Sequence, residues 1–236
     1  MNLEGKTAII TGGTGALGSV IAAQFLEAGA NIGIPYSSAK SRGALPQLAS
    51  GTGSVLAWQA DLTSEADVGR FIQEFRGRFG RIDILVNAAG GYVGGALVEE
   101  SSLSEVEGIM KLNLTTTFLM CRAVIPVMRG QKYGRIVNIS ASPAVTPKPR
   151  MGSYAVSKGA VITLTETIAS EVKGTGLTAN AVVPSIILTE ANKKSMPEAD
   201  VSKWVTPLEI ARLILYLSSK EAGSVSGNVI KIYGGV

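Results

Sequence analysis

The 236-residue sequence contains no histidine and only one cysteine. Without histidine, the chain can build neither a Ser-His-Asp nor a Cys-His nucleophile system, and it cannot bind zinc through imidazole. We therefore expect general acid chemistry to come from tyrosine, lysine, aspartate or glutamate, and we expect no metal site. The single cysteine, Cys121, excludes an intrachain disulfide and lies in an apolar run. This context predicts a buried thiol rather than a reactive one.

Charged residues and long apolar runs are also scarce. Charged residues make up 17% of the chain and hydrophobic residues 46%, which is typical of a compact globular protein. The net charge is +4, but lysine and arginine are scattered, so we expect no nucleic-acid partner. No apolar run approaches the roughly 20 residues that cross a bilayer, so we expect no membrane partner. Residues 1–10 resemble a strand rather than a leader sequence, and we expect a cytoplasmic protein.

Seven short runs rich in valine and isoleucine alternate with longer segments of helical period. This order predicts an α/β fold with a single doubly wound (Rossmann) seven-stranded parallel sheet, helices on both faces and right-handed crossovers. We expect one domain over residues 1–236, because no linker or repeat divides the chain. The predicted strands lie within 6–12, 31–37, 54–61, 81–90, 134–140, 177–184 and 227–235.

Three segments between these runs carry further predictions. Residues 64–80 predict an amphipathic helix that buries Val68, Phe71, Ile72 and Phe75. The proline-rich stretch 142–150 predicts a loop. The polar segment 190–204 predicts a flexible cover over a small-molecule substrate.

The stretch "TGGTGALG", residues 11–18, follows the first predicted strand and opens the first predicted helix. Glycines let the backbone turn sharply there, and a helix N-terminus offers free N–H groups to phosphate. The alternative is a tight strand-to-helix turn without a ligand. We predict a dinucleotide site that includes Gly12, Thr14, Gly15, Ala16, Leu17 and Gly18.

The end of the second predicted strand bears on which dinucleotide binds. No aspartate or glutamate occurs from Ala28 to Ala60, although a site for the unphosphorylated ribose usually has a carboxylate there. This favours NADP(H), with NAD(H) possible. The alternative is that the charged groups of Lys40 and Arg42 are only solvated and bind no phosphate. The residues placed to meet a 2′-phosphate are Tyr36, Ser37, Ser38, Lys40 and Arg42.

Tyr154 and Lys158 lie four residues apart at the start of a predicted helix, so they share one face. A nearby ammonium group stabilises phenolate and should lower the pKa of the tyrosine. Tyr154 is thus a candidate proton donor to an oxygen or nitrogen that receives a hydride. The alternative is a surface tyrosine stacked along a lysine stem.

The combined motifs resemble those of the short-chain dehydrogenase/reductase family over essentially the whole chain. They are "TGGTGALG", "AD" at 60–61, "NAAG" at 87–90, Asn113 in "KLNLTTTF" and the Tyr154/Lys158 pair. Two positions depart from the family pattern, because Ala16 and Ser185 stand where glycine is common. The resemblance implies an NAD(P)-dependent oxidoreductase that forms a homodimer or homotetramer through helices near 103–129 and 152–173.

The resemblance also implies a role for each matching residue. Lys158 would hold the nicotinamide ribose beside Tyr154, and Asn113 would kink its helix and hold a water molecule of a proton relay. Adenine would contact Asp61 and Leu62. The central part of the cofactor would meet Asn87, Ala88, Ala89 and Gly90, and the nicotinamide and diphosphate would meet Pro184, Ile187 and Thr189.

One position argues for a narrower likeness. Family members usually carry a serine thirteen residues before the tyrosine, where this chain has Ala141 between Ser140 and Ser142. Either a loop adjustment turns Ser142 inward or the hydroxyl is absent, and neighbouring residues on a strand face opposite ways. Quinonoid dihydropteridine reductases also carry alanine there, and "AGGYVGGA" and "NKKSMPEADVSKWVTPLE" resemble their sequences.

Three functions remain open from the sequence. The first is reduction of a quinonoid dihydropterin with Tyr154 as proton donor, and the second is reduction of a carbonyl or 3-oxoacyl thioester. The third, of another class, is a catalytically silent dinucleotide-binding regulator, suggested by Ala141 and Ser185.

Overall fold

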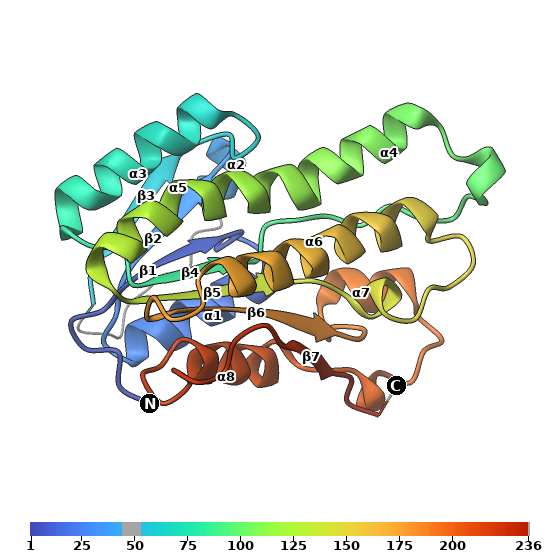
Figure 1. Cartoon of the computed structure of the whole chain (residues 1–236). Coiled ribbons are helices and arrows are strands. Elements are labelled where there is room, and N and C mark those ends of the chain that lie inside the picture. The colour runs from blue at the N-terminus through green and yellow to red at the C-terminus, as the bar shows by residue number, and fades with distance from the viewer. Residues whose placement is uncertain (44–52, 236) are drawn as a thin grey trace.

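The computed structural model describes residues 1–43 and 53–235, together with the backbone of every helix and strand in these ranges. Its centre is a seven-stranded sheet of order β3-β2-β1-β4-β5-β6-β7 (Figure 1). Every adjacent pair of strands is parallel, which confirms the predicted doubly wound sheet. The strands are β1 Thr7–Thr11, β2 Asn31–Tyr36, β3 Val55–Gln59, β4 Ile84–Asn87, β5 Gly134–Ile139, β6 Leu177–Pro184 and β7 Val229–Ile232.

Helices connect the strands on both sides of the sheet. The α-helices are α1 Ala16–Glu27, α2 Ala39–Gly43, α3 Glu65–Phe79, α4 Leu103–Met110, α5 Thr116–Gln131, α6 Gly152–Glu171, α7 Glu190–Ser195 and α8 Pro207–Leu217. Shorter turns of helix are η1 Val98–Glu100, the π-helical η2 Lys111–Thr115, η3 Ser142–Ala144 and η4 Val201–Lys203. Among the described residues, no helix combines the length and the apolarity needed to cross a membrane.

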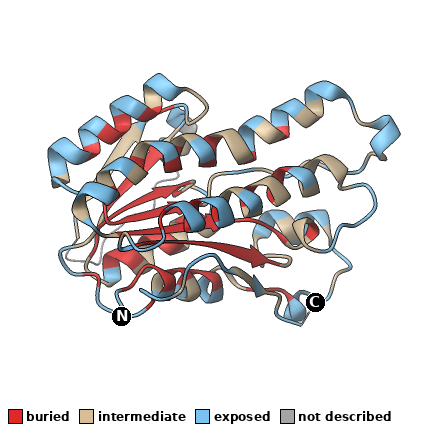
Figure 2. Ribbon diagram, in the orientation of Figure 1, coloured by how far each residue is buried: buried red, intermediate tan, exposed pale blue. Residues whose placement is uncertain are grey.

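The strands send alternate side chains into two hydrophobic cores, one on each face of the sheet. In β1, Ala8 and Ile10 join α1 and α8 on one face, whereas Ile9 joins α3, α5 and α6 on the other. This period of two matches the pleat of a strand covered on both sides. Figure 2 shows the sheet as the most continuously buried part of the molecule, between two layers of helices.

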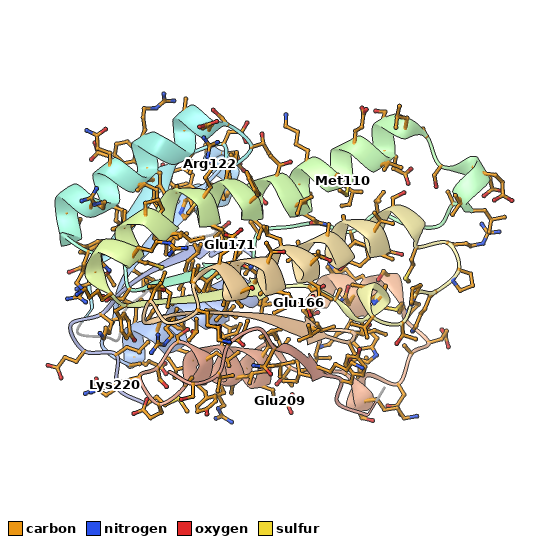
Figure 3. All side chains as sticks on the ribbon, in the orientation of Figure 1. Met110, Arg122, Glu166, Glu171, Glu209 and Lys220 are labelled. Atoms are coloured by element: carbon orange, nitrogen blue, oxygen red, sulfur yellow. The ribbon has the colours of Figure 1, made fainter. Side chains whose placement is uncertain are left out.

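Helix α3 shows how the sequence pattern leads to one of these layers. Ser64 caps its start by accepting the N–H of Asp67, and Gly80 ends it at φ 76°, a backbone angle that suits glycine. The four predicted core residues, Val68, Phe71, Ile72 and Phe75, are buried. On the outer side, Arg122 of α5 reaches Glu65 at the start of α3 with an N–O distance of 3.0 Å (Figure 3).

The parallel order brings the candidate residues together. Strand β1 lies between β2 and β4, so the connections after β1 and β4 run to opposite sides of the sheet and leave a crevice at their carboxyl ends. The glycine turn follows β1, "NAAG" begins in β4, Ala141 follows β5, and Ser185 follows β6. Segments far apart in sequence therefore meet at one edge.

Candidate active site

The glycine turn packs its backbone tightly against the segment that follows β4. Gly12 has φ +67°, and a Cβ there would lie 2.8 Å from the carbonyl carbon of Ala88. A Cβ at Gly18 would collide with the carbonyl oxygen of Gly12. The Gly15 N–H donates to the Gly12 carbonyl at 2.8 Å, which closes the turn. Only glycine fits at these two close approaches.

The same turn leaves the start of α1 open. Gly15 is the N-cap and supplies no side-chain hydrogen bond, and Gly15 and Ala16 are exposed. The first N–H groups of a helix have no partner within the helix and carry a partial positive charge. Thr14 and Leu17 beside them are partly buried. This cradle of backbone N–H groups fits the diphosphate of a dinucleotide.

Side chains of β1, β4 and β5 fix the edge of the sheet behind the turn. The Ala89 N–H donates to Thr11 Oγ1 at 3.0 Å. Asn87 Nδ2 donates to Asn138 Oδ1 at 2.9 Å, and Asn138 Nδ2 donates to Thr165 Oγ1 on α6 at 2.9 Å. The Nδ2 group of Asn87 therefore connects β4 to β5 inside the protein, while its buried Oδ1 has no hydrogen-bond partner among the described residues.

Asn113 joins three parts of the site through one buried amide. Its Oδ1 accepts the Gly91 N–H at 2.8 Å, and its Nδ2 donates to the Gly91 carbonyl at 3.1 Å and to Ser157 Oγ at 2.9 Å. Asn113 lies in the π-helical turn η2, which begins directly after Met110, the last residue of α4 (Figure 3). The long helix expected over 103–129 is thus interrupted where Asn113 turns inward.

Gly90 is the point where Asn113 and Lys158 converge. A Cβ at Gly90 would lie 2.7 Å from Asn113 Oδ1 and 3.1 Å from Lys158 Nζ. Gly90 is exposed, unlike the buried side chains of Asn113 and Lys158 behind it. The backbone at the end of "NAAG" is therefore packed against Asn113 and Lys158, two of the three candidate catalytic residues.

Lys158 is buried and held by backbone groups. Its Nζ donates to the Ile139 carbonyl at 3.0 Å, and its own carbonyl accepts from Ser140 Oγ at 2.8 Å. Burial lowers the pKa of the Lys158 ammonium group to about 8. The ammonium group remains mostly charged at neutral pH and is aimed at the end of β5.

Tyr154 corrects one expectation from the sequence. Burial raises the pKa of its phenol to about 12, and the neighbouring Tyr92 adds to this increase. The expected lowering of the Tyr154 pKa by Lys158 is wrong for this structure, because burial of the ring dominates the shift and no lysine charge offsets it. A phenol that keeps its proton at neutral pH is a proton donor rather than a base.

The structure shows what surrounds Ala141, the position of the missing hydroxyl. Ser140 is buried and its hydroxyl is used by the Lys158 carbonyl. Ala141 is buried at the end of β5, and Ser142, partly buried, begins the helical turn η3. The proline-rich segment after it is the predicted loop, apart from this turn. Ser140 is therefore not a free substitute for the absent hydroxyl.

The residues expected near the adenosine end follow β2 and β3. Ser37 and Ser38 are exposed and Tyr36 is partly buried. Ser38 Oγ accepts the Ser41 N–H at 3.2 Å at the start of α2. The side chain of Lys40 lies outside the described residues, and Arg42 is exposed.

Asp61 follows β3 and is exposed. Its Oδ1 accepts the backbone N–H of Thr63 at 2.8 Å and the Thr63 hydroxyl at 2.7 Å. These two hydrogen bonds hold the pKa of Asp61 below its ordinary value. Leu62 packs partly against the core of α3 and α5. Asp61 thus stays ionised while its backbone remains at the edge of the crevice.

The segment after β6 runs across the same edge. Pro184 is buried, and Ile187 forms a parallel bridge with Val205. Thr189 caps α7 by accepting the Asn192 N–H at 3.2 Å. Ser185 donates to the Tyr233 carbonyl at 2.8 Å, so its side chain is engaged with the chain's end rather than with the crevice.

Three residues of the site were not found by sequence reasoning. Ser157 is the partner of Asn113, Tyr92 contacts Tyr154, and Arg150 binds the loop that carries Tyr92. Ser157 lies three residues after Tyr154, and Tyr92 stands alone among glycines in "GGYVGG". Both spacings are visible in the sequence, but neither indicates a partner without the fold.

Comparison with known proteins agrees with this geometry. The family model described as short chain dehydrogenase matches residues 6–200. D-beta-hydroxybutyrate dehydrogenase of Rhizobium meliloti is 31% identical, and the alignment covers 98% of each chain. The 3-oxoacyl-(acyl-carrier-protein) reductase FabG of Thermotoga maritima is 31% identical over 100% of this chain and 99% of the relative.

Solved structures show the same arrangement. Levodione reductase superposes with a TM-score of 0.91 at 28% identity, covering 99% of this chain and 98% of that one. A short-chain type dehydrogenase/reductase from Mycobacterium ulcerans gives a TM-score of 0.94 at 24% identity, over 100% of this chain and 90% of that one. The second likeness concerns the fold alone.

Proposed function

The chain belongs to the short-chain dehydrogenase family, and from this premise we propose that it is an NADP(H)-dependent reductase in which Tyr154 donates the proton. As a member of this family it is an oxidoreductase with an NAD(P) cofactor. The observation that carries the proposal is the convergence of Asn113 and Lys158 at Gly90, at the edge of the sheet where α1 also starts. Lys158 lies on the same face of α6 as Tyr154. The family likeness supports hydride chemistry at this point.

The described residues fit the cofactor. The Gly12–Gly18 cradle would hold the diphosphate, and the buried Lys158 would hold the nicotinamide ribose hydroxyls. Arg42 is exposed beyond the end of β2, and no carboxylate lies between Ala28 and Ala60 to repel a 2′-phosphate. These features favour NADP(H) over NAD(H).

The chain's own groups supply the proton chemistry. When bound, the reduced nicotinamide supplies a hydride. The Tyr154 hydroxyl donates its proton to the substrate oxygen or nitrogen that gains the electron pair, and its raised pKa keeps that proton in place at neutral pH. The ammonium group of Lys158 stabilises the phenolate that remains. Asn113 holds the Gly91 backbone, which keeps the loop over the site in position.

Two substrate classes are supported by different observations. The names of the relatives, a hydroxybutyrate dehydrogenase and a 3-oxoacyl reductase, support a carbonyl or 3-oxoacyl thioester. The buried Ala141 and the engaged Ser140 favour a conjugated ring such as a quinonoid dihydropterin, because such a ring needs less help from a carbonyl-polarising hydroxyl. We place the conjugated ring first on the chemistry of this chain's own residues.

Replacement of the phenol tests the reductase. Tyr154→Phe should lower kcat by roughly 100-fold to 10,000-fold, the range of general acid catalysis, while the dissociation constants of NADPH and NADH stay unchanged. The assay follows oxidation of each cofactor with a quinonoid dihydropterin and with acetoacetyl-coenzyme A. Tyr216→Phe on α8 is the matched control and should keep full activity. Equal turnover by Tyr154→Phe and the wild type would instead support the silent regulator.

We also propose a cover over the substrate and a surface for self-association. Residues 190–204 form α7, η4 and the turn between them, beside the segment after β6, and we place them as the cover over the substrate. An apolar groove of about 620 Å³ between α5 and α6 includes Phe118 and Leu164. We propose that a second copy of the chain covers this groove.

A further inference from the structure

Two tyrosine rings meet where the proton is donated. The ring centroids of Tyr92 and Tyr154 lie 5.0 Å apart, with an interplanar angle of 72°. This edge-to-face geometry is favourable for aromatic pairs. Tyr92 is 61% exposed, whereas Tyr154 is largely covered. Tyr92 therefore contacts the proton donor with part of its ring and presents the rest to incoming molecules.

The backbone on both sides of Tyr92 is fixed. Before it, Gly91 is bound through its N–H and its carbonyl by the amide of Asn113. After it, the Gly95 N–H donates to the Arg150 carbonyl at 2.8 Å, and Arg150 Nη1 donates to the Gly95 carbonyl at 2.7 Å. A Cβ at Gly94 would collide with the Tyr92 hydroxyl, so the glycine leaves room for the ring. These contacts fix the loop on either side of the Tyr92 ring.

The two hydrogen bonds between Gly95 and Arg150 form a clasp, and Arg150 adopts an unusual backbone conformation within it. Its φ is +63°, a left-handed value that costs free energy for a residue with a side chain. Such conformations persist where surrounding contacts require them, and they concentrate at functional sites. Arg150 also approaches Glu100 Oε2 at 3.7 Å. The clasp between Gly95 and Arg150 joins the loop after β4 to the loop before α6.

We infer that Tyr92 is an aromatic wall of the substrate site that selects flat, unsaturated rings over open-chain carbonyl compounds. The inference rests on the proposed reductase. A substrate atom that takes the Tyr154 proton lies within hydrogen-bond reach of the phenol oxygen, and Tyr92 contacts that phenol. A flat π system attached to this atom stacks on the wall, whereas a flexible chain gains less contact and loses more conformational freedom.

Tyr92→Leu keeps apolar bulk but removes the ring. It should raise KM for a quinonoid dihydropterin roughly threefold to tenfold, with KM for acetoacetyl-coenzyme A and the NADPH dissociation constant unchanged. Tyr92→Phe should keep the wild-type preference, and Tyr216→Leu on α8 is the control. An equal change for both substrates, or no change for the pterin, overturns the inference.

Arg150→Ala tests the clasp without altering either ring. It removes the hydrogen bond from Nη1 to the Gly95 carbonyl and keeps the bond from the Gly95 N–H to the carbonyl of residue 150. It should shift the preference in the same direction as Tyr92→Leu, by a smaller factor, and an unchanged preference would show that this side-chain bond does not position Tyr92. Circular dichroism melting checks that each variant is folded.

A binding experiment separates this inference from the proposed reductase. If the wild type oxidises NADPH with neither substrate, the reductase proposal fails. Titration of pterin fluorescence with biopterin in the presence of NADP⁺ then tests the wall alone. Weaker binding by Tyr92→Leu than by the wild type supports it. Equal binding, or no binding by the wild type, overturns it.

Discussion

Burial shifts the pKa values of Tyr154 and Lys158, both on α6, in opposite directions. It raises the pKa of Tyr154 to about 12 and lowers that of Lys158 to about 8. In both residues burial favours the uncharged form, because a charge in a low-dielectric interior loses its hydration. At neutral pH the phenol keeps its proton beside a mostly charged ammonium group. This pairing suits reduction, in which the proton leaves the phenol.

Lys158→Met should stabilise the folded chain at neutral pH. The pKa of Lys158 falls from 10.5 to about 8 on folding, which corresponds to a cost on the order of 3 kcal/mol. Below pH 8 both states carry the proton and the wild type bears this full cost. As pH rises from 8 towards 10.5, the folded chain loses the proton first, so the wild type gains stability. Urea unfolding of both proteins from about pH 7 to about pH 10 measures the narrowing difference.

The comparison of the two proteins isolates the lysine. Tyr154 and Cys121, each with a pKa raised to about 12 by burial, titrate in both and cancel from the difference. Loss of the hydrogen bond to the Ile139 carbonyl lowers the gain by about 1 kcal/mol without adding a pH dependence. A difference that stays constant with pH would contradict the burial argument.

At the scale of the element, the turn from β1 into α1 depends on two glycines. Gly18→Ala places a methyl group against the Gly12 carbonyl. We expect it to lower the free energy of unfolding by about 1–3 kcal/mol, as overpacking does, and to weaken NADPH binding. Denaturant unfolding and a fluorescence titration with NADPH measure the two effects.

Gly69 on α3 is the matched control for this helical glycine. A Cβ there has no heavy atom within 4 Å, and the helix interior favours alanine. Gly69→Ala should therefore raise the free energy of unfolding by about 0.5–1 kcal/mol and leave NADPH binding unchanged. Similar losses from both substitutions would show that the close contact at Gly18 is not the cause.

The strands were predictable because each is a short apolar run that must be buried on both faces. All seven predicted runs contain the observed strands, from Thr7–Thr11 to Val229–Ile232. The helix over 64–80 was predictable for the same reason, since its apolar residues follow one face. Periodicity did not predict the π-helical turn at Lys111–Thr115, because it arises when Asn113 turns inward to a loop distant in sequence. Only the family resemblance placed a kink of the helix at Asn113.

The candidate site was predictable in membership but not in its interactions. Parallel strands place every motif at one edge, so Gly12, Gly90 and Lys158 had to approach one another. Periodicity could not show that Asn87 pairs with Asn138 or that Tyr92 contacts Tyr154. The pKa of Tyr154 depends on how deeply the ring is covered, which sequence spacing does not define.

At the scale of the whole molecule, exposed apolar side chains gather on α4, η2, α5 and α6. Leu103, Leu112, Phe118 and Val156 are exposed by 41% to 72%. Phe118 lines the groove between α5 and α6, and Leu103 and Val156 line a second hollow. Contiguous apolar surface on a folded chain indicates an interaction site. A second copy would bury it by placing like helices together, as a two-fold interface does.

Phe118→Lys should convert the assembled protein to monomers, because it places a charge in the centre of this groove. Light scattering measures the mass of the wild type and the variant. Leu208→Lys on α8, where the leucine is 37% exposed, is the matched control and should keep the wild-type mass. A monomeric wild type would refute the assembly, and equal dissociation by both variants would remove the groove as its site.

The hold of Asn113 on Gly91 has an evolutionary consequence. The asparagine recognises only the main-chain groups of that residue, as an adjacent β-strand would. Side chains further along the loop after β4 can then be exchanged by mutation while the hydrogen bonds to the Gly91 backbone are kept. A lineage carrying this anchor can explore new substrates while inheriting the same proton donor.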